Sequence, residues 1–224
     1  MIDPRIVAHR GFTLLETENT LAAFEAAMTL GCRAIEFDVH ATNDGVWVVQ
    51  HDPTLSRIHG VDLSIAACSL DMLRAEAPVV TLTEALEVFP IGVRPMVEVK
   101  PTLATHFDAL AEDLARFTPL DPIVIVRGDL PRAANDALPN VPIYLFSENW
   151  AEAYARRGEP IAGYDLRHDA ILPEQIADEC ARFAAAGKEV AVWTVDEDAL
   201  VRQWLEAGVP WVITNRPDQV GMVF

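Results

Sequence analysis

The sequence predicts an α/β protein with the (β/α)8, TIM-type barrel fold, and three observations support this. Short apolar runs, many of them β-branched, alternate with helical patterns along the 224 residues, as expected of parallel strands joined by crossover helices. One of nine strand candidates belongs to a hairpin, which leaves the eight parallel strands of a closed barrel. No linker, low-complexity tract or internal repeat interrupts the sequence, so we expect residues 1–224 to form a single barrel domain.

The strand candidates are short apolar runs spread along the chain. In order, they cover residues 6–9, 34–39, 46–50, 96–100, 123–127, 143–146, 162–165, 190–194 and 211–214. The turn signal Asn43-Asp44-Gly45 separates the second run from the third and leaves no room for a crossover helix. Residues 46–50 are therefore expected to form the antiparallel arm of a short hairpin after the second barrel strand.

Helical patterns fill most of the intervals between the strands. They cover residues 20–30, 70–76, 82–89, 104–117, 130–138, 150–156, 173–186 and 197–207. Gly31, Gly187 and Gly208 directly follow three of these segments, as glycine commonly does at a helix C-terminus. A doubly wound open sheet is the alternative fold, but no G-x-G-x-x-G turn follows any strand.

Composition and charge exclude several classes of protein. The chain is 51% hydrophobic, which excludes a disordered protein, and no apolar run approaches the roughly 18 residues of a membrane span. The net charge is −17 and no basic run is present, so we expect neither nucleic acid nor an anionic membrane as a partner. No signal peptide is recognisable at the N-terminus, and Cys32, Cys68 and Cys180 show no disulfide or zinc pattern. These features predict a cytoplasmic protein without a stable membrane anchor.

Polar residues near the C-terminal ends of apolar strands indicate where a site would lie, because barrel enzymes place their active sites at that face. Glu36 and Asp38 share one face of their strand, and Glu98 and Lys100 share one face of theirs. The apolar residues between them would pack on the helices, which turns these polar pairs inward. Three converging carboxylates need a countercharge in a poorly solvated cavity. An all-oxygen ligand set favours one hard divalent cation, Mg²⁺ or Ca²⁺.

Two histidines complete this constellation. His9 ends the first strand, and His51 follows the hairpin arm. A lone Glu in a strand is usually exposed, and a lone His is more often structural than catalytic. Two carboxylate-bearing strand ends together with two histidines at strand ends favour a site.

A series of short motifs runs through nearly the whole chain. In order they are His9-Arg10-Gly11, Glu18-Asn19-Thr20, Glu36-Phe37-Asp38-Val39, Thr42-Asn43-Asp44-Gly45, His51-Asp52-Pro53-Thr54-Leu55, Glu98-Val99-Lys100, Trp193-Thr194-Val195 and Thr214-Asn215-Arg216-Pro217. A single H-R-G triplet is a weak signal, but this ordered series is highly specific. It resembles the glycerophosphodiester phosphodiesterase family.

The resemblance implies a (β/α)8 barrel that hydrolyses a small anionic phosphodiester. The products would be sn-glycerol 3-phosphate and an alcohol. Position by position, the resemblance implies that Glu36, Asp38 and Glu98 bind the divalent cation. It also implies that His9 and His51 are the general acid and base, and either one can take either role. The nucleophile is water or the substrate's own glycerol hydroxyl.

Further residues match the substrate-binding positions of the family. The resemblance implies that Arg10 and Lys100 hold the phosphate, as a planar donor fork and a point charge. Trp193 either lines the glycerol pocket or packs in the core. Glu18 is a second-tier residue that either assists the metal site or caps the first helix. Asn215 is also second tier, because it follows the last strand, where barrels often bind phosphate.

The chain also departs from the usual family pattern. The stretch 61–80 is short, so we expect a reduced insertion after the hairpin. Arg127 ends a strand and could point at the substrate, but an exposed ion pair is the expectation. His40 is expected to be exposed. The alternatives are a lysophospholipase D-type or other phospholipid phosphodiesterase, and a catalytically silent barrel that binds phosphorylated ligands. A silent barrel predicts the loss of a catalytic His or carboxylate, and none is lost. The head group and the oligomeric state are left open.

Overall fold

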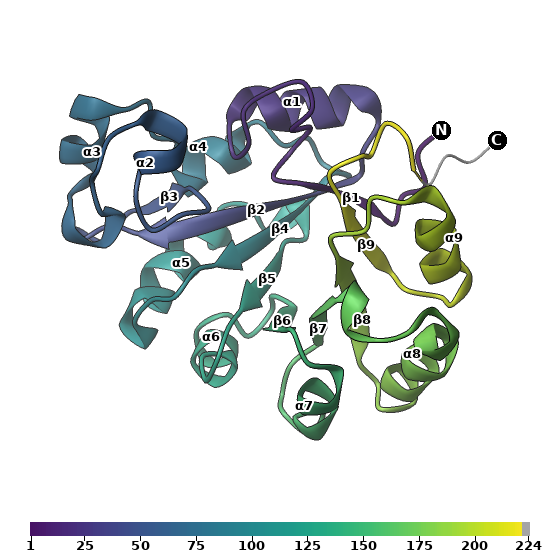
Figure 1. Cartoon of the computed structure of the whole chain (residues 1–224). Coiled ribbons are helices and arrows are strands. Elements are labelled where there is room, and N and C mark those ends of the chain that lie inside the picture. The colour runs from purple at the N-terminus through teal and green to yellow at the C-terminus, as the bar shows by residue number, and fades with distance from the viewer. Residues whose placement is uncertain (221–224) are drawn as a thin grey trace.

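Eight parallel strands close into a barrel in the computed structural model, which describes residues 1–220 (Figure 1). They are β1 (Ile6–His9), β2 (Ala34–Ala41), β4 (Arg94–Val99), β5 (Ile123–Val126), β6 (Ile143–Ser147), β7 (Gly163–Arg167), β8 (Glu189–Trp193) and β9 (Trp211–Thr214). The ring is closed because β1 pairs in parallel with both β2 and β9. This confirms the predicted TIM-type (β/α)8 barrel.

The remaining strand, β3 (Trp47–Val49), forms the predicted hairpin. It pairs antiparallel with the end of β2, where Val39 lies opposite Val49. Gly45 occupies the turn with a φ of 83°, a left-handed conformation that glycine adopts without a steric penalty. The hairpin arm therefore lies beside the barrel and does not add a strand to it.

Helices cover the outside of the barrel (Figure 1). They are α1 (Leu21–Leu30), α4 (Leu82–Glu87), α5 (Phe107–Ala115), α6 (Pro131–Ala137), α7 (Trp150–Ala155), α8 (Ile176–Ala185) and α9 (Asp198–Glu206). The sequence predicts all of these helices, although most of the expected segments extend beyond the observed helix ends. The turns η2 (Ala104–His106) and η5 (Pro173–Gln175), which precede α5 and α8, are 3-10 and not α-helical.

Alternation along the strands separates two apolar cores. The core between the strands and the helices includes Phe24, Ile35, Phe37 and Trp204. A second cluster fills the inside of the barrel and consists of Val7, Ala34, Met96, Ile123, Ile125, Tyr144, Ala191 and Ile213. Because strand side chains have a period of two, the residue two positions after an inward residue also points into the barrel. These positions lie closer to the C-terminal ends of the strands, and most of them are polar or aromatic.

A small insertion lies between β3 and α4. It contains α2 (Ser56–His59), η1 (Ile65–Ala67) and α3 (Leu70–Glu76), and Figure 1 shows it to the side of the barrel. Its own apolar cluster includes Val48, Leu55, Ile65, Leu73 and Val79. Just before it, the backbone N–H of Gln50 donates to the carbonyl oxygen of Asp38 at 3.0 Å. This contact places His51 next to β2.

Within residues 1–220, no helix is long and apolar enough to cross a membrane. The three cysteines are free and buried. Burial raises the pKa of Cys32 to about 12 and that of Cys180 to about 11. These two side chains are therefore packed thiols and not reactive thiolates.

Candidate active site

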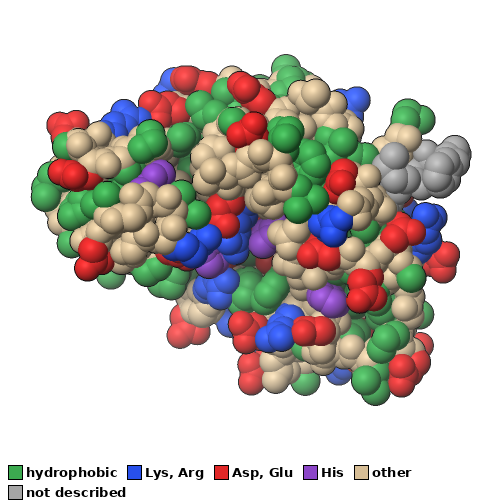
Figure 2. Space-filling view, turned by 45° about the horizontal axis from the view of Figure 1, so that its top comes forward, with side chains coloured by type: hydrophobic (Ala, Val, Ile, Leu, Met, Phe, Trp, Pro, Cys, Tyr) green, Lys and Arg blue, Asp and Glu red, His purple; other side chains and the backbone are tan. Residues whose placement is uncertain are grey.

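The C-terminal ends of the strands surround a cavity of about 120 Å³. Its lining includes His9, Glu36, Glu98, Lys100, Arg127, Phe146, Asp165 and Trp193 from the barrel and His51 from the segment that follows β3. In Figure 2, histidine, basic and acidic side chains gather around a recess near the middle of the view. The cavity lies at the end of the barrel where the sequence predicts the site.

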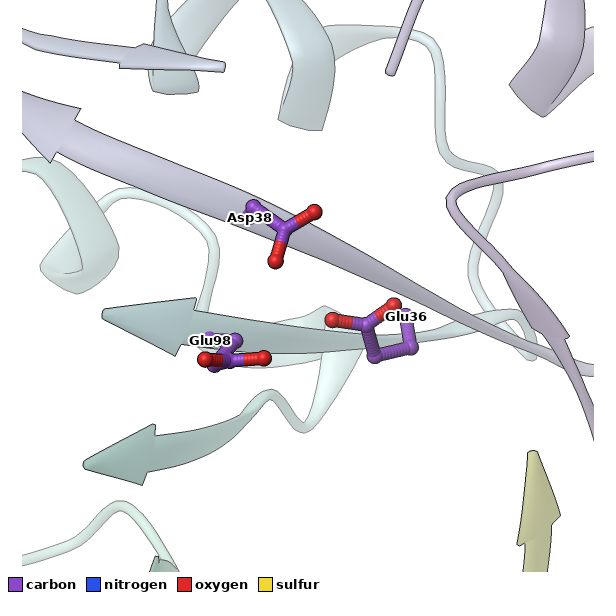
Figure 3. Close-up of side chains that lie close together, drawn as sticks. All are labelled: Glu36, Asp38 and Glu98. Carbon is purple, nitrogen blue, oxygen red and sulfur yellow. The ribbon is translucent and has the colours of Figure 1, made fainter. Parts of the chain in front are cut away.

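Glu36 and Asp38 of β2 and Glu98 of β4 form a compact carboxylate cluster. One oxygen of each lies within 4.8 Å of the others, and Figure 3 shows the three side chains converging between the two strands. Both carboxylate oxygens of Glu36 are buried without a hydrogen-bond partner among the described residues. Burial, followed by the charges of Asp38 and Glu98, raises the pKa of Glu36 well above its usual value. A buried carboxylate in this position fits a bound cation, and the cluster can hold one.

Of the three carboxylates, Asp38 has the surroundings that most favour the ionised form. Lys100 Nζ lies 2.6 Å from its Oδ1, and Arg10 Nε lies 3.2 Å from its Oδ2. The Asn19 amide also donates to Oδ2, at 2.9 Å. Burial opposes ionisation of Asp38, but Lys100 and Arg10 outweigh it and lower its pKa to about 2. Asp38 is therefore an anion at neutral pH.

Glu98 joins two cationic side chains. Lys100 Nζ and Arg127 Nε each donate to its Oε1 at 2.8 Å. Burial opposes the charge on Lys100, but Asp38 and Glu98 raise its pKa. The expectation of an exposed surface ion pair for Arg127 is wrong. Arg127 comes two positions after the inward residue Ile125, so alternation directs it into the cavity.

His9 is held by a hydrogen-bonded chain that starts beyond β8. Its Nδ1 lies 2.7 Å from Asn215 Oδ1. The Asn215 amide nitrogen donates to Asp196 at 2.9 Å, so the amide oxygen faces His9 and accepts from Nδ1–H. The Nε2 atom then carries the lone pair, 3.8 Å from Glu36 Oε2. Burial, followed by the charge of Arg10, lowers the pKa of His9 below 6.5, so its ring is neutral at pH 7.

His51 belongs to a second network, which connects it to Arg10. Its Nδ1 lies 2.7 Å from Asp52 Oδ1, and Asp52 accepts from Arg57 at 2.5 Å. Arg57 also donates twice to Glu18, at 2.6 and 3.0 Å. Glu18 accepts from Arg10 at 3.1 Å. Glu18 therefore orients Arg10 and Arg57 and is not one of the three clustered carboxylates.

The turn after β1 has an unusual backbone conformation. Arg10 has a φ of 57° and Gly11 a φ of 89°. A Cβ atom on Gly11 would lie 2.7 Å from Ala23, so the close approach and the positive φ both require glycine. The Arg10 backbone N–H donates to the Glu36 carbonyl at 2.7 Å. The turn thereby fixes Arg10 beside β2.

Aromatic side chains line another part of the cavity. Phe146 of β6 and Trp193 of β8 stack with their ring centroids 4.8 Å apart. The Arg127 guanidinium lies 3.3 Å from the Phe146 centroid. Trp193 lines the cavity and also packs against the apolar cluster inside the barrel.

Six residues of the site were missed by the sequence analysis: Asn19, Asp52, Arg57, Phe146, Asp165 and Asp196. Phe146 and Asp165 each end a strand candidate on the inward face, so alternation was an available signal for both. The roles of Asn19 and Asp196 depend on contacts between distant segments. The expected exposure of His40 is also wrong: it is 8% exposed, and its Nε2 bonds to the His51 carbonyl at 3.0 Å.

Known proteins resemble this chain in sequence and in fold. Residues 9–219 match the glycerophosphoryl diester phosphodiesterase family. A probable glycerophosphodiester phosphodiesterase of Mycobacterium tuberculosis is 30% identical over 237 residues, which is 95% of this chain and 87% of the relative. A lysophospholipase D of Rattus norvegicus is 42% identical, but over 62 residues, which is 28% of this chain and 20% of the relative.

A solved structure extends the comparison to three dimensions. An Oleispira antarctica phosphodiesterase in complex with the product sn-glycerol-3-phosphate has a TM-score of 0.84 and 26% identity, covering 97% of this chain and 95% of that chain. The match of fold and the match of sequence both extend over the strand ends that carry the carboxylate cluster. The chain thus belongs to the glycerophosphoryl diester phosphodiesterase family and is a phosphoric diester hydrolase.

Proposed function

We propose that this protein hydrolyses glycerophosphodiesters to sn-glycerol 3-phosphate and an alcohol, with one divalent cation, Mg²⁺ or Ca²⁺, bound by Glu36, Asp38 and Glu98. One observation carries the proposal: Glu36 is buried beside two further carboxylates, and neither of its oxygens has a hydrogen-bond partner within residues 1–220. All-oxygen ligand sets favour hard cations. When bound, the cation supplies charge neutralisation and polarises the phosphoryl group toward attack.

Arg10 and Lys100 bind the phosphate in this proposal. Arg10 is oriented by Glu18 and Asp38, while Lys100 lies between Asp38 and Glu98. The first offers a planar set of donors and the second a compact charge. Both line the cavity. The anionic substrate therefore meets local positive charge in a protein whose net charge is −17.

The two histidines divide the proton transfers. His9 acts as the general base that takes a proton from a water molecule as this water attacks the phosphorus, because its ring is held through Nδ1 and leaves Nε2 free to accept a proton. His51 acts as the general acid, because the contact of its Nδ1 with the Asp52 carboxylate orients the ring and leaves Nε2 for the leaving oxygen. His51 then donates its proton to the leaving alkoxide. Each transfer contributes about 10²–10⁴-fold to the rate.

The experiment is to measure sn-glycerol 3-phosphate released from glycerophosphocholine, glycerophosphoethanolamine and glycerophosphoglycerol. We expect release in Mg²⁺ or Ca²⁺, none after EDTA, and recovery when the ion is returned. Lysophosphatidylcholine is the comparison substrate. A higher kcat/KM on it would support lysophospholipase D activity instead, and binding of sn-glycerol 3-phosphate without turnover of any diester would support a silent barrel.

A further inference from the structure

One buried acidic residue faces the cavity from outside the carboxylate cluster. Asp165 is 3% exposed and lines the cavity from β7. In the closed ring, β7 lies four strands from β2 in either direction, so Asp165 faces the site from the side opposite Glu36 and Asp38. Its Oδ1 is buried and accepts no hydrogen bond from the part of the chain that the structure describes.

Packing does not account for this carboxyl group. A buried carboxyl group without a hydrogen-bond partner lowers the stability of the folded protein. The apolar cluster inside the barrel offers Asp165 no such partner. Burial, followed by the charge of Glu98, raises the pKa of Asp165, so its surroundings oppose its ionised form. A polar group left unsatisfied inside a native cavity calls for a functional explanation, and a bound ligand that completes its hydrogen bonds is one.

The neighbours of Asp165 fit a small polyol. Phe146 lies next to it in the register between β6 and β7, and Phe146 stacks on Trp193. Trp193 Nε1 is itself buried, again without a hydrogen-bond partner in residues 1–220. A hydroxyl group both donates and accepts, so one unpaired acceptor and one unpaired donor beside aromatic rings match the hydroxyls and carbon chain of a polyol.

We propose that Asp165 accepts hydrogen bonds from the two free hydroxyl groups of the substrate's glycerol, that Trp193 Nε1 donates to one of them, and that this pair selects diesters of unacylated glycerol. The inference rests on the proposed function and deepens it. The glycerol end of the diester then lies toward β7 and β8. The leaving alcohol occupies the wider space of about 360 Å³ beside His51, Pro53 and Pro101.

This assignment predicts discrimination between substrate classes. A lysophospholipid carries an acyl chain on one of the two glycerol hydroxyls, so it loses one hydrogen bond to Asp165. It also brings an acyl chain into a cavity of about 120 Å³. A site built to bind a hydroxyl group discriminates strongly against an analogue that lacks it, because the buried polar group is left unpaired.

The experiment uses two esters that differ only in the hydroxyls: glyceryl p-nitrophenyl phosphate and n-propyl p-nitrophenyl phosphate. Asp165→Ala and Asp165→Asn are compared with Asp113→Asn, a half-buried carboxyl on α5 that accepts a hydrogen bond from Thr83. We expect both Asp165 variants to lower kcat/KM for the glyceryl ester by about 10–100-fold. The propyl ester should change less than threefold, and Asp113→Asn should affect neither ester.

Equal losses on the two esters would overturn the inference, because Asp165 would then act through the phosphate or the metal cluster. Binding measured by calorimetry is a second test, because it does not depend on turnover and a misfolded variant would lose both ligands. Calorimetry should show that Asp165→Asn weakens binding of sn-glycerol 3-phosphate but not of n-propyl phosphate, and equal weakening again counts against it. If the wild type hydrolyses neither ester, the proposed function fails, and calorimetry alone decides the inference.

Discussion

The Asn215 amide oxygen lies 2.7 Å from His9 Nδ1, while its amide nitrogen donates to Asp196 at 2.9 Å. The Asn215 backbone N–H and the Thr214 hydroxyl also donate to the same Asp196 carboxylate. Asp196 thereby fixes the orientation of the amide, and the amide fixes the tautomer of His9. A histidine with a hydrogen bond on one ring nitrogen presents the other nitrogen in a defined protonation state.

Asn215→Leu tests this relationship. The substitution keeps the approximate size of the side chain but removes the acceptor, so His9 can take the other tautomer or rotate. We expect kcat to fall by about 10–100-fold, as is typical when the partner that orients a functional histidine is lost, with KM changed less than threefold. Asn140→Leu, at an exposed position before β6, is the control. A kcat within twofold of wild type would show that Asn215 does not position His9.

The pH dependence of kcat/KM gives a second prediction for the same pair. Burial, followed by Arg10, lowers the pKa of His9 below 6.5, while the Asn215 hydrogen bond raises it. A general base must be neutral, so activity should be lost as the pH falls through a value below 6.5. Asn215→Leu removes the contact that raises the pKa, and should move this acidic limb to lower pH. An acidic limb above pH 7 in the wild type would rule out His9 as the base.

Glu36→Gln tests whether the buried Glu36 carboxylate destabilises the metal-free protein. In the metal-free protein, burial with Asp38 and Glu98 raises the folded-state pKa of Glu36 above its usual 4.5. A raised pKa favours folding at low pH, and this contribution is lost as the pH rises through the folded-state value. Gln resembles the protonated acid, so the metal-free variant should have a higher Tm than wild type at pH 7. The difference should vanish at pH 4.

The cation should not stabilise the Glu36→Gln variant against thermal unfolding. A ligand at 100 times its Kd stabilises a protein by about 2.7 kcal/mol, which corresponds to several degrees in Tm for a chain of this size. We expect Mg²⁺ or Ca²⁺ to raise the Tm of the wild type but not that of Glu36→Gln. Glu87→Gln, on the exposed end of α4, should behave as wild type. Equal shifts in all three proteins would place the cation elsewhere.

Much of the fold and part of the site follow from local sequence rules. The strands could be placed because each is a short apolar run, and the turn at Asn43-Asp44-Gly45 explains why β3 stays outside the barrel. Glu36, Asp38, Glu98 and Lys100 could be directed inward by period-two alternation alone. The same rule applied to the strands of Arg127 and Asp165 would have placed both in the cavity.

The connections between distant segments could not be read from the sequence. Asn19 reaches Asp38 because of the turn at Arg10 and Gly11. Arg57 reaches Glu18 because the insertion contacts the segment between β1 and α1. Such pairs combine residues 19 and 39 positions apart, and no local periodicity relates them. The sequence therefore predicts which strands carry the site, while the orientation of its side chains depends on the tertiary structure.

The last prediction concerns how a protein of net charge −17 binds an anion. Arg10 and Lys100 lie inside the cavity and are half-buried and buried, respectively, so salt screens their contacts with a bound phosphate only weakly. The many acidic groups outside it repel the approaching substrate, and this repulsion is screened beyond about 8–10 Å at physiological ionic strength. Added salt should therefore leave kcat/KM unchanged or raise it slightly. A severalfold fall between low and physiological salt would indicate long-range attraction by positive charge instead.

Lys100→Met tests the local contact directly. Removing the ammonium deletes a charge-assisted contact to phosphate and also leaves Asp38 and Glu98 without their shared cation. Hydrogen bonds to charged groups contribute about 1.5–3 kcal/mol, so kcat/KM should fall at least tenfold. Arg202→Met, on the exposed face of α9, is the matched loss of one positive charge and should change kcat/KM less than twofold. If both variants lose activity equally, net charge and not the contact at Lys100 governs binding.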